Sequence, residues 1–415
     1  MLGALLAGAG LALCLYVGVL VLADLYLIAV HIRASRRRSG SETMLHNDEP
    51  LVCVQLPVFN EPALVAAAID SLCALDWPRD RLEIMVLDDS TDETTSIVAQ
   101  KTAEWRSKGV AIDHVVRPDR DGFKAGALAA GQERSAARYF AIFDADYRPL
   151  PSFLRQTVPA LLADPQLAFV QARLGYRNRD RNWLTRAQAL EFDTQFGFDQ
   201  AARNWADMPM TFNGTCGVWR REAIDQAGGW RGDTVAEDQD LSFRAFALGW
   251  RSRLLLDVSA PGELPESFDV LVQQRQRWTT GTAQVFRKLP WHLIRDMGWL
   301  QATAFVFLTL FNSTATAVLV AILALAAACI LVAPAWAVVI GLGWLATVAL
   351  LVGLRTIGAA LAAQLLGRRL DFTFICDVAA HWILQFALLP SAGRSLLTGH
   401  LARAVPFVRT PKQGQ

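Results

Sequence analysis

The sequence predicts an α/β protein in which a mostly parallel, doubly wound sheet is inserted between α-helical transmembrane segments. Apolar runs typical of buried strands alternate with helical segments between residues 51 and 143, as in parallel sheets. Long apolar segments flank this central part, and about 20 apolar residues are enough to span a bilayer. The chain has 415 residues, 53% of them hydrophobic, and a mean hydropathy of +0.26, which is high for a soluble enzyme.

The elements of the central part follow from its apolar runs and its turn residues. Runs rich in apolar residues predict strands at 51–57, 82–87, 111–116, 139–143 and 167–173. Helical periodicity predicts helices at 62–75, 91–108, 125–137, 183–204 and 240–248. The alternation becomes less regular after residue 165, so the parallel sheet is expected mainly before that point.

The first apolar segment, Leu2 to Val30, predicts a retained transmembrane helix. It lacks a basic start and is too long for a cleaved signal peptide. A basic cluster from Arg33 to Arg38 follows it, and the positive-inside rule places this cluster in the cytoplasm. Further apolar segments at 302–332, 336–354 and 372–389 bring the expected total to four or five spans.

We therefore expect a multi-pass protein of the inner (plasma) membrane with a cytoplasmic catalytic domain. Aromatic residues that alternate with Arg and Lys after residue 285 predict a helix at the level of the lipid headgroups. The expected parts are an N-terminal transmembrane helix (1–32), a basic cytoplasmic linker (33–50), the catalytic domain (51–285), an interfacial amphipathic helix (286–299), C-terminal transmembrane helices (300–390), and a basic cytoplasmic or interfacial tail (391–415).

Charge and cysteine content exclude two classes of site. The formal net charge is +1, so we expect no nucleic-acid partner. The six cysteines, at 14, 53, 73, 216, 329 and 376, form no CxxC pair. This pattern argues against a disulfide framework or a zinc site, and it suits a reducing compartment.

Paired carboxylates stand where two of the predicted strands end. Asp88 and Asp89 follow one strand, and Asp144 and Asp146 follow another. Ligands of open α/β sheets bind at the carboxyl ends of strands. An Asp-x-Asp pair offers oxygen ligands for the Mg²⁺ or Mn²⁺ that accompanies a nucleotide diphosphate. Carboxylates at strand ends also cap helices, but the expected convergence of both pairs favours a metal site.

Two further charged residues lie at predicted helix starts. Lys124 follows a glycine turn and opens a helix, a position suited to a phosphate group, although most such lysines are simply solvated. Asp238 precedes another helix and is the candidate general base for an acceptor hydroxyl. The alternative is that Glu237, Asp238 and Asp240 only cap that helix.

Two polar motifs complete the pattern. In Gln274–Trp278, the guanidinium of Arg277 suits a diphosphate leaving group and the indole of Trp278 suits stacking on a sugar. The same pentapeptide is also compatible with an interfacial helix. Phe212–Gly217 predicts a flexible turn that approaches an acceptor, or else an ordinary glycine turn.

Together these motifs resemble those of the processive family-2 glycosyltransferases, which include cellulose, chitin and hyaluronan synthases. The similarity is strongest to the plant cellulose synthase-like A and C proteins, which make β-mannan, glucomannan or β-1,4-glucan backbones. It covers about 51–290 and implies a GT-A fold with an inverting single displacement. The stretches that carry it are 54–61, 75–81, 86–92, 124–128, 141–146, 212–220, 227–230 and 273–278.

The resemblance also implies a role for individual residues. Asp238 would be the catalytic base, and Asp144 and Asp146 would bind Mg²⁺ or Mn²⁺. Nucleotide-sugar binding would involve Pro57, Glu61, Asp88, Asp89, Lys124, Asp144, Asp146 and Arg277. Acceptor binding would involve Gly214, Thr215, Cys216, Glu237, Gln274 and Trp278.

The expected function is a membrane hexosyltransferase that extends a β-1,4-linked polysaccharide from UDP-glucose or GDP-mannose, processively and coupled to export. The alternative is a non-processive enzyme that adds one sugar to a membrane lipid such as ceramide or diacylglycerol. The expected partners are accordingly a nucleotide sugar, a glycan or lipid acceptor, and membrane lipids. A pore lined by polar and aromatic residues would favour the polymerase, and a lateral opening to lipid would favour the alternative.

Overall fold

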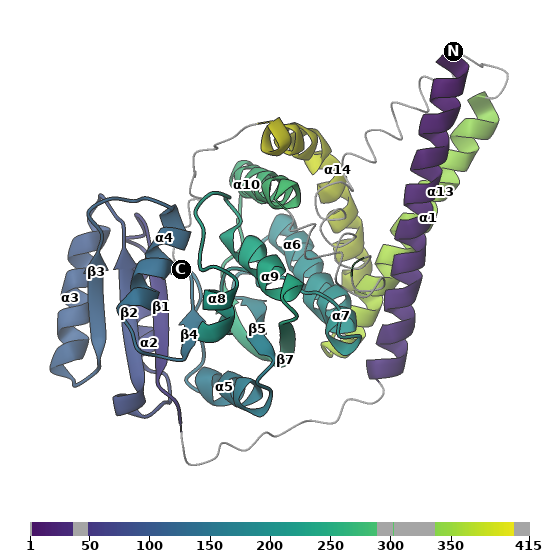
Figure 1. Cartoon of the computed structure of the whole chain (residues 1–415). Coiled ribbons are helices and arrows are strands. Elements are labelled where there is room, and N and C mark those ends of the chain that lie inside the picture. The colour runs from purple at the N-terminus through teal and green to yellow at the C-terminus, as the bar shows by residue number, and fades with distance from the viewer. Residues whose placement is uncertain (1, 36–48, 289–301, 303–336, 402–415) are drawn as a thin grey trace.

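The computed structural model describes residues 2–35, 49–288, 302 and 337–401. Its centre is a seven-stranded sheet with helices on both faces, beside which long helices stand (Figure 1). The strand order is β3-β2-β1-β4-β6-β5-β7. Only β6 runs antiparallel to its neighbours, so the predicted mostly parallel sheet is confirmed.

The parallel half of the sheet matches the apolar runs of the sequence. Its strands are β1 (Val52–Val58), β2 (Leu82–Asp88), β3 (Ile112–Val116) and β4 (Tyr139–Ile142). Successive side chains of a strand point to opposite faces, and β1 accordingly contributes Val52, Val54 and Leu56 to one apolar core and Cys53 to the other. Burial on both faces explains why β1, β2 and β4 lack polar alternation, whereas the edge strand β3 exposes Asp113 and Val116.

The second half of the sheet comprises β5 (Leu167–Tyr176), β6 (Gly217–Arg220) and β7 (Arg251–Gly262). The helices on the face that carries the larger core include α2 (Val65–Cys73), α3 (Thr94–Ser107) and α5 (Phe153–Ala163). The opposite face is covered by α4 (Phe123–Glu133), α8 (Arg221–Gln226) and α9 (Glu237–Ala247).

Register brings the carboxyl ends of three strands together at one edge of the sheet. Val58 of β1 pairs with Asp88 of β2, and Gln55 of β1 pairs with Ile142 at the end of β4. The chain order reverses at β1, between β2 and β4, which is the place where open α/β sheets bind ligands. Residues that follow these strands therefore meet at one site.

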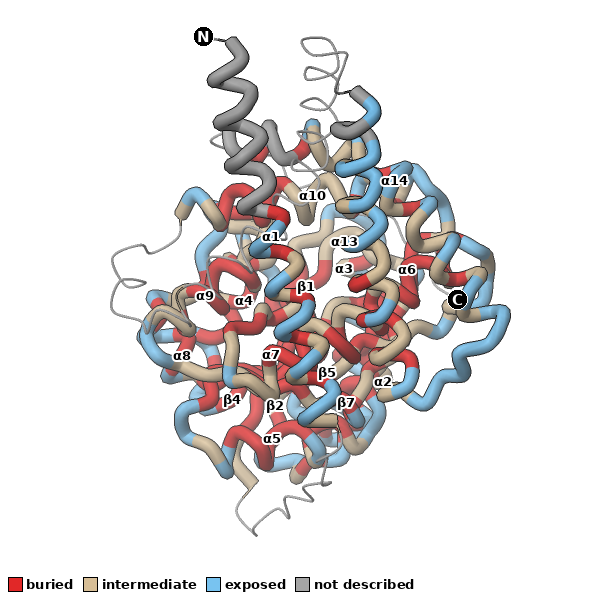
Figure 2. Tube along the Cα trace, turned by 90° about the vertical axis from the view of Figure 1, so that its right-hand side faces the viewer, coloured by how far each residue is buried: buried red, intermediate tan, exposed pale blue. Residues whose placement is uncertain are grey.

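Three helices are long and apolar enough to cross a membrane, judged by length and composition. They are α1 (Leu2–Ser35), α13 (Ala337–Leu365) and α14 (Phe372–Leu401), with candidate spans at Val17–Ser35, Leu342–Leu365 and Phe372–Ser395. Helix α1 packs against α13. Where α13 rises above the buried centre, apolar side chains such as Leu342 and Leu345 are exposed (Figure 2).

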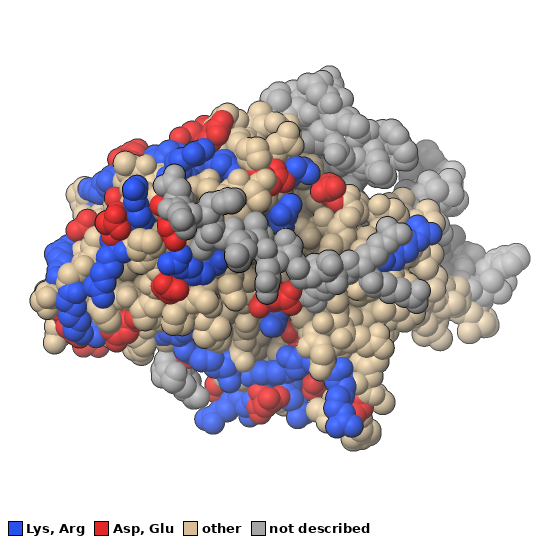
Figure 3. Space-filling view, turned by 90° about the horizontal axis from the view of Figure 1, so that it is seen from below, with Lys and Arg blue, Asp and Glu red and all other residues tan. Residues whose placement is uncertain are grey.

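Charged side chains are distributed differently. Figure 3 shows basic and acidic residues intermingled over the sheet domain and sparser toward the long helices. This contrast fits a chain whose α/β part faces water and whose long helices face a less polar medium.

Several predicted boundaries differ from the structure. The helix expected at 183–204 is three elements: α6 (Trp183–Thr194), the π-helical turn η2 (Gln195–Gln200) and α7 (Ala201–Trp205). The predicted domain boundary at 285 falls inside α10 (Phe268–Arg287). The residues outside the described ranges include most of the predicted interfacial helix at 286–299, the apolar segment 302–332 after its first residue, and most of the tail 391–415.

Candidate active site

One cavity of about 800 Å³ lies at the carboxyl edge of the sheet and extends to the long helices. We call it the central cavity. Every residue predicted from the sequence to be in the site lines it, except Asp88 and Cys216. The lining comes from strand ends, helix starts and the membrane-type helices α1, α13 and α14, so elements far apart in the sequence form one space.

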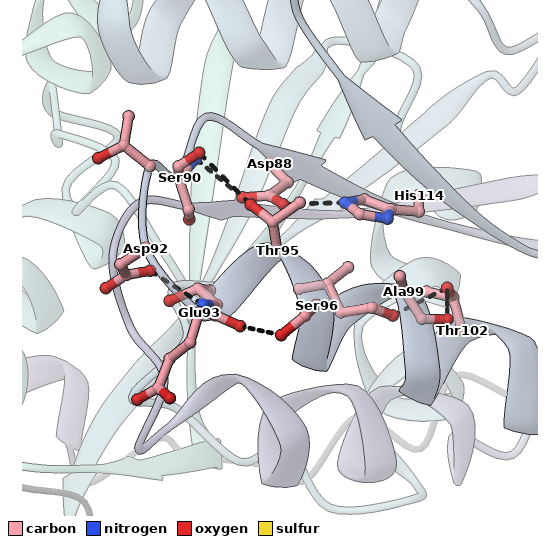
Figure 4. A network of polar contacts seen from close by, with 12 residues as sticks. Asp88, Ser90, Asp92, Glu93, Thr95, Ser96, Ala99, Thr102 and His114 are labelled. Atoms are coloured by element: carbon pink, nitrogen blue, oxygen red, sulfur yellow. Dashed lines mark hydrogen bonds and ion pairs between the residues drawn. The ribbon is translucent and has the colours of Figure 1, made fainter.

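Asp88 is directed away from the cavity because neighbouring residues at the end of β2 face opposite sides. Its buried carboxylate accepts a hydrogen bond from the Ser90 backbone and lies 2.8 Å from His114 Nε2 (Figure 4). Burial alone would raise the pKa of Asp88, but the hydrogen bonds from His114 and Ser90 hold it below its ordinary value. Asp88 therefore organises the loop after β2.

Asp89 faces the cavity and is held by Arg117, an arginine that belongs to none of the sequence motifs. Arg117 donates from Nε and Nη2 to the two Asp89 carboxylate oxygens, at 2.8 and 2.6 Å. A second arginine, Arg120, lies over the ring of Phe59 with its guanidinium carbon 3.3 Å from the ring centre. Asp89, Arg120 and Phe59 all line the cavity, at the end where the nucleotide is expected.

Lys124 opens α4 and lies among carboxylates. Its Nζ is 2.5 Å from Asp144 Oδ1, 2.9 Å from the Gly214 carbonyl oxygen and 4.0 Å from Glu237 Oε1. Burial opposes the charged form, but Asp144 and Glu237 outweigh it and raise the pKa of Lys124 above its ordinary range. A positively charged side chain thus stands in the middle of the acidic group.

Asp238 and Glu237 lie in the first turn of α9, where the helix dipole favours negative charge. Burial, with Glu237 adding to it, nevertheless raises the pKa of Asp238 to about 7, even though Lys124 opposes the shift. Burial likewise raises the pKa of Glu237. A carboxylate with a pKa near neutrality is suited to accept a proton from a hydroxyl group.

Two features require glycine at position 214: its backbone conformation and the closeness of neighbouring side chains. Its φ is +73°, a conformation that side chains rarely adopt. A Cβ atom there would lie 3.0 Å from Asp238 Oδ2 and 3.4 Å from Lys124 Nζ. The next residue, Thr215, accepts a hydrogen bond from the Asp144 backbone N–H at 2.9 Å, while Cys216 is fully buried behind the loop. This loop therefore positions the acidic group.

Helix α10 presents Gln274, Arg277 and Trp278 to the cavity. Residues spaced i, i+3 and i+4 share one face of a helix, so the motif spacing explains the shared orientation. The carboxylates of Glu237, Asp144 and Asp238 act on Arg277, although burial dominates and lowers the pKa of its guanidinium. Arg277 and Lys124 are thus two cations close to the same carboxylates.

The carboxylates of the cavity fit a divalent ion whose coordination shell is completed by substrate phosphates. Within the described ranges, no group of three or more His, Cys, Asp and Glu side chains is arranged to enclose a metal ion alone. Asp144 and Asp146 both line the cavity. Mg²⁺ commonly binds through one or two carboxylates, with substrate phosphates completing its shell. These two residues are the ones that would bind such an ion.

A cluster of ion pairs lines the cavity beside the long helices α1 and α13. Arg355 of α13 lies 2.9 Å from Asp24 of α1 and 2.9 Å from Asp199 of η2. On the same π-helical turn, Gln195 and Gln200 donate to the Asn213 side-chain oxygen at 3.0 and 3.4 Å. In the sequence, this cluster is indicated by Asp24 and Arg355, which are charged residues within apolar segments. Such residues are rare in membrane helices and are usually paired.

Comparisons with known proteins identify the family of this chain. Residues 139–352, about half of the 415, match the family described as Glycosyl transferase family group 2. Glucomannan 4-β-mannosyltransferase 2 of Arabidopsis thaliana is 42% identical over 263 residues, which are 61% of this chain and 49% of that protein. Glucomannan 4-β-mannosyltransferase 1 of Oryza sativa subsp. japonica is 41% identical over 251 residues, covering 60% and 48%. The chain spans about half the length of these relatives.

A solved structure shows the same fold. The mannosyltransferase PcManGT from Pyrobaculum calidifontis, in complex with GDP-Man and Mn²⁺, aligns with a TM-score of 0.58 at 24% identity. The alignment covers 93% of this chain and 99% of that one. The expected GT-A-type α/β fold is therefore confirmed, and the chain belongs to Glycosyl transferase family group 2.

Proposed function

We propose that this protein transfers mannose from GDP-mannose to the 4-hydroxyl of a β-linked glycan, a β-mannan or glucomannan. The observation that carries the proposal is that Asp238, the two cations Lys124 and Arg277, and the indole of Trp278 line one cavity. The names of the plant relatives support the hexose and the linkage, and the GDP-Man in PcManGT supports the donor.

The chemistry follows from the positions of the charged groups. Asp238 accepts the proton of the acceptor hydroxyl, whose oxygen attacks the anomeric carbon. The bond from that carbon to the diphosphate breaks as the new bond forms, so the configuration inverts. Lys124 and Arg277 oppose the charge that develops on the leaving diphosphate. A divalent ion bound by Asp144 and Asp146 would supply further charge neutralisation.

We also propose that the enzyme retains its product between transfers and passes it toward the membrane helices. The cavity extends from Trp278 to α14, where His381, Trp382 and Gln385 line it. Polar and aromatic side chains suit a polyhydroxylated chain, because they combine hydrogen bonding with flat apolar faces. This lining supports a polymerase coupled to export.

A second candidate function is supported by a different part of the same cavity. Its lining on α1 and α13 includes the apolar side chains of Leu20, Val348, Leu351 and Val352 beside the ion pair of Asp24 and Arg355. An acyl chain could lie there, so transfer of one sugar to a lipid such as ceramide or diacylglycerol is the alternative outcome of the assay below.

We further propose that the α/β domain is cytoplasmic, in a multi-pass protein of the plasma membrane. Arg33, in the last turn of α1, and the basic residues after it support this orientation. A reporter fused after Ser35 should then be active only in the cytoplasm. Activity confined to the opposite side would refute the orientation and remove access to nucleotide sugars.

The decisive assay uses the purified full chain, a divalent ion and radiolabelled nucleotide sugars. With mannotriose as acceptor, GDP-mannose should give β-1,4-linked products longer than one addition. UDP-glucose is the donor control. Transfer only from UDP-glucose would refute the donor assignment. Product formed only with ceramide or diacylglycerol would establish the second candidate, and a single addition to mannotriose would refute processivity.

A further inference from the structure

We propose that Arg275 is a positioning residue that sets the orientation of Trp278, and that Glu191 holds it in place. This inference rests on the proposed function, in which Trp278 is the platform for the terminal acceptor sugar. Arg275 stands within the Gln274–Trp278 motif, where the sequence pattern alone indicates no role for it. Its contacts in the structure give it one.

The indole of Trp278 is contacted by a cation and by a second aromatic ring. The guanidinium carbon of Arg275 lies 4.7 Å from the centre of the indole, one helical turn away on α10. The ring of Phe192 meets the indole edge to face, with centres 6.0 Å apart and planes at 80°. A cation over an indole is attracted by the negative ring face. A sugar can then stack only on the face that Arg275 leaves open.

Arg275 is itself held by a fork of two hydrogen bonds. Its two terminal nitrogens donate to the two carboxylate oxygens of Glu191 at 2.5 and 2.9 Å. Gln385 donates to the same carboxylate at 3.2 Å. These residues belong to α10, α6 and α14, so the orientation of the platform depends on the packing of three helices.

The arrangement uses properties that belong to arginine and not to lysine. A planar guanidinium can stack on an aromatic face while it donates two parallel hydrogen bonds to one carboxylate. An ammonium group can do only one of these well. The side chains of Arg275 and Glu191 are 15% and 23% exposed, so water screens the pair only weakly. The pair is therefore rigid enough to transmit its position to Trp278.

The test is a kinetic comparison of Arg275→Lys and Glu191→Gln with the unchanged protein. The assay uses purified full chain, GDP-mannose and mannotriose, and it records both KM values and the hydrolysis of GDP-mannose without acceptor. Each variant should raise the KM for mannotriose by roughly 3- to 30-fold, the range of a partly buried cation–aromatic contact. Donor KM and hydrolysis should stay within about twofold, since Arg275 acts on the acceptor platform.

A second comparison asks whether Arg275 acts through Trp278. In a Trp278→Ala background, adding Arg275→Lys should change the Kd for mannotriose, measured by calorimetry, by less than about twofold, because residues that act as one unit are not additive. If the second substitution adds its full loss, Arg275 contacts the acceptor by itself and the proposal is wrong. Equal losses in donor and acceptor KM would also refute it.

Arg155 provides a matched control outside the cavity. It pairs with Glu49 at 2.6 Å and lies over the ring of Trp77, 5.3 Å from its centre. Arg155→Lys should leave the KM for mannotriose unchanged, and an equal rise there would show a general structural effect and refute the proposal. If the unchanged protein uses another nucleotide sugar, the assignment of GDP-mannose as donor is wrong. The KM values of the variants relative to the unchanged protein, measured with that other donor, still decide the role of Arg275.

Discussion

The Nζ atom of Lys124 lies 2.5 Å from Oδ1 of Asp144, which joins the start of α4 to the end of β4. The residue expected to bind the donor phosphates is thus held by a carboxylate expected to bind the metal ion. Lys124 also stands 4.0 Å from Glu237. Its charge offsets repulsion among carboxylates that would otherwise destabilise the site.

Replacing Lys124 by Met should therefore have two effects. Loss of a charge-assisted contact to the diphosphate should raise the KM for the donor by roughly 10- to 100-fold. Because Lys124 lowers the pKa of Asp238, its removal should also move the acid limb of the pH–rate profile to higher pH. A normal donor KM in this variant would exclude Lys124 from the donor site.

Asp238→Asn and Trp278→Ala should separate the base from the acceptor platform. Asn cannot accept a proton, so both transfer and donor hydrolysis should fall by ~10²–10⁴-fold while donor binding survives. Trp278→Ala removes only the stacking surface, so slow hydrolysis should persist while polymer formation is lost. Both rates are measured from GDP release with and without acceptor. The same pattern of loss in both variants would contradict this division, and normal polymerisation by Asp238→Asn would point to Glu237 or Asp240 instead.

The pH dependence should report the raised pKa of Asp238. A base must be deprotonated, so kcat/KM should decrease as the pH falls below about 7. The free energy of unfolding should change with pH in the opposite direction to the activity. The folded state holds this proton more tightly than an ordinary carboxyl with a pKa of 3.8, so stability is lost as the pH rises from about 4 to about 7. Asp238→Asn should therefore melt at a higher temperature than the unchanged protein at pH 8, but not at pH 4.

Removal of divalent ions should abolish transfer. Excess chelator should stop product formation, and Mg²⁺ or Mn²⁺ should restore it. Asp146→Asn should lose most activity at any metal concentration, whereas its thermal unfolding midpoint should be retained, because the amide keeps the shape of the side chain. Full activity in excess chelator would refute the metal requirement.

The Arg355 cluster should dominate the packing of α13 on the rest of the protein. Arg355→Met removes the ion-pair partner of the buried Asp24 and the partly buried Asp199 and leaves Arg203 as the remaining nearby cation, so it should cost roughly 1–3 kcal/mol of the free energy of unfolding. Thermal unfolding in detergent measures this loss. Arg253→Met is the control, since its pair with Asp164 is 3.6 Å long and more exposed, and it should change stability by less than about 0.5 kcal/mol.

Local pattern predicted the parallel half of the sheet closely and the second half poorly. Strands β1, β2 and β4 are buried on both faces, and their apolar runs mark them without reference to the rest of the chain. Strands β6 and β7 were not predicted. The four residues of β6 become a strand because they pair antiparallel with β4 and β5, and such long-range pairing leaves little local signal.

By itself, the sequence determined which strand ends carry carboxylates and which helix face carries Gln274, Arg277 and Trp278. Both depend on short-range periodicity, which is the same in any fold. Only the tertiary structure decided that Asp89 and not Asp88 faces the cavity. It also decided that Arg117 holds Asp89, that Glu191 holds Arg275, and that Asp24 meets Arg355. Each of these pairs joins residues distant in sequence, and their contact depends on how separate elements pack, a relationship that no local pattern contains.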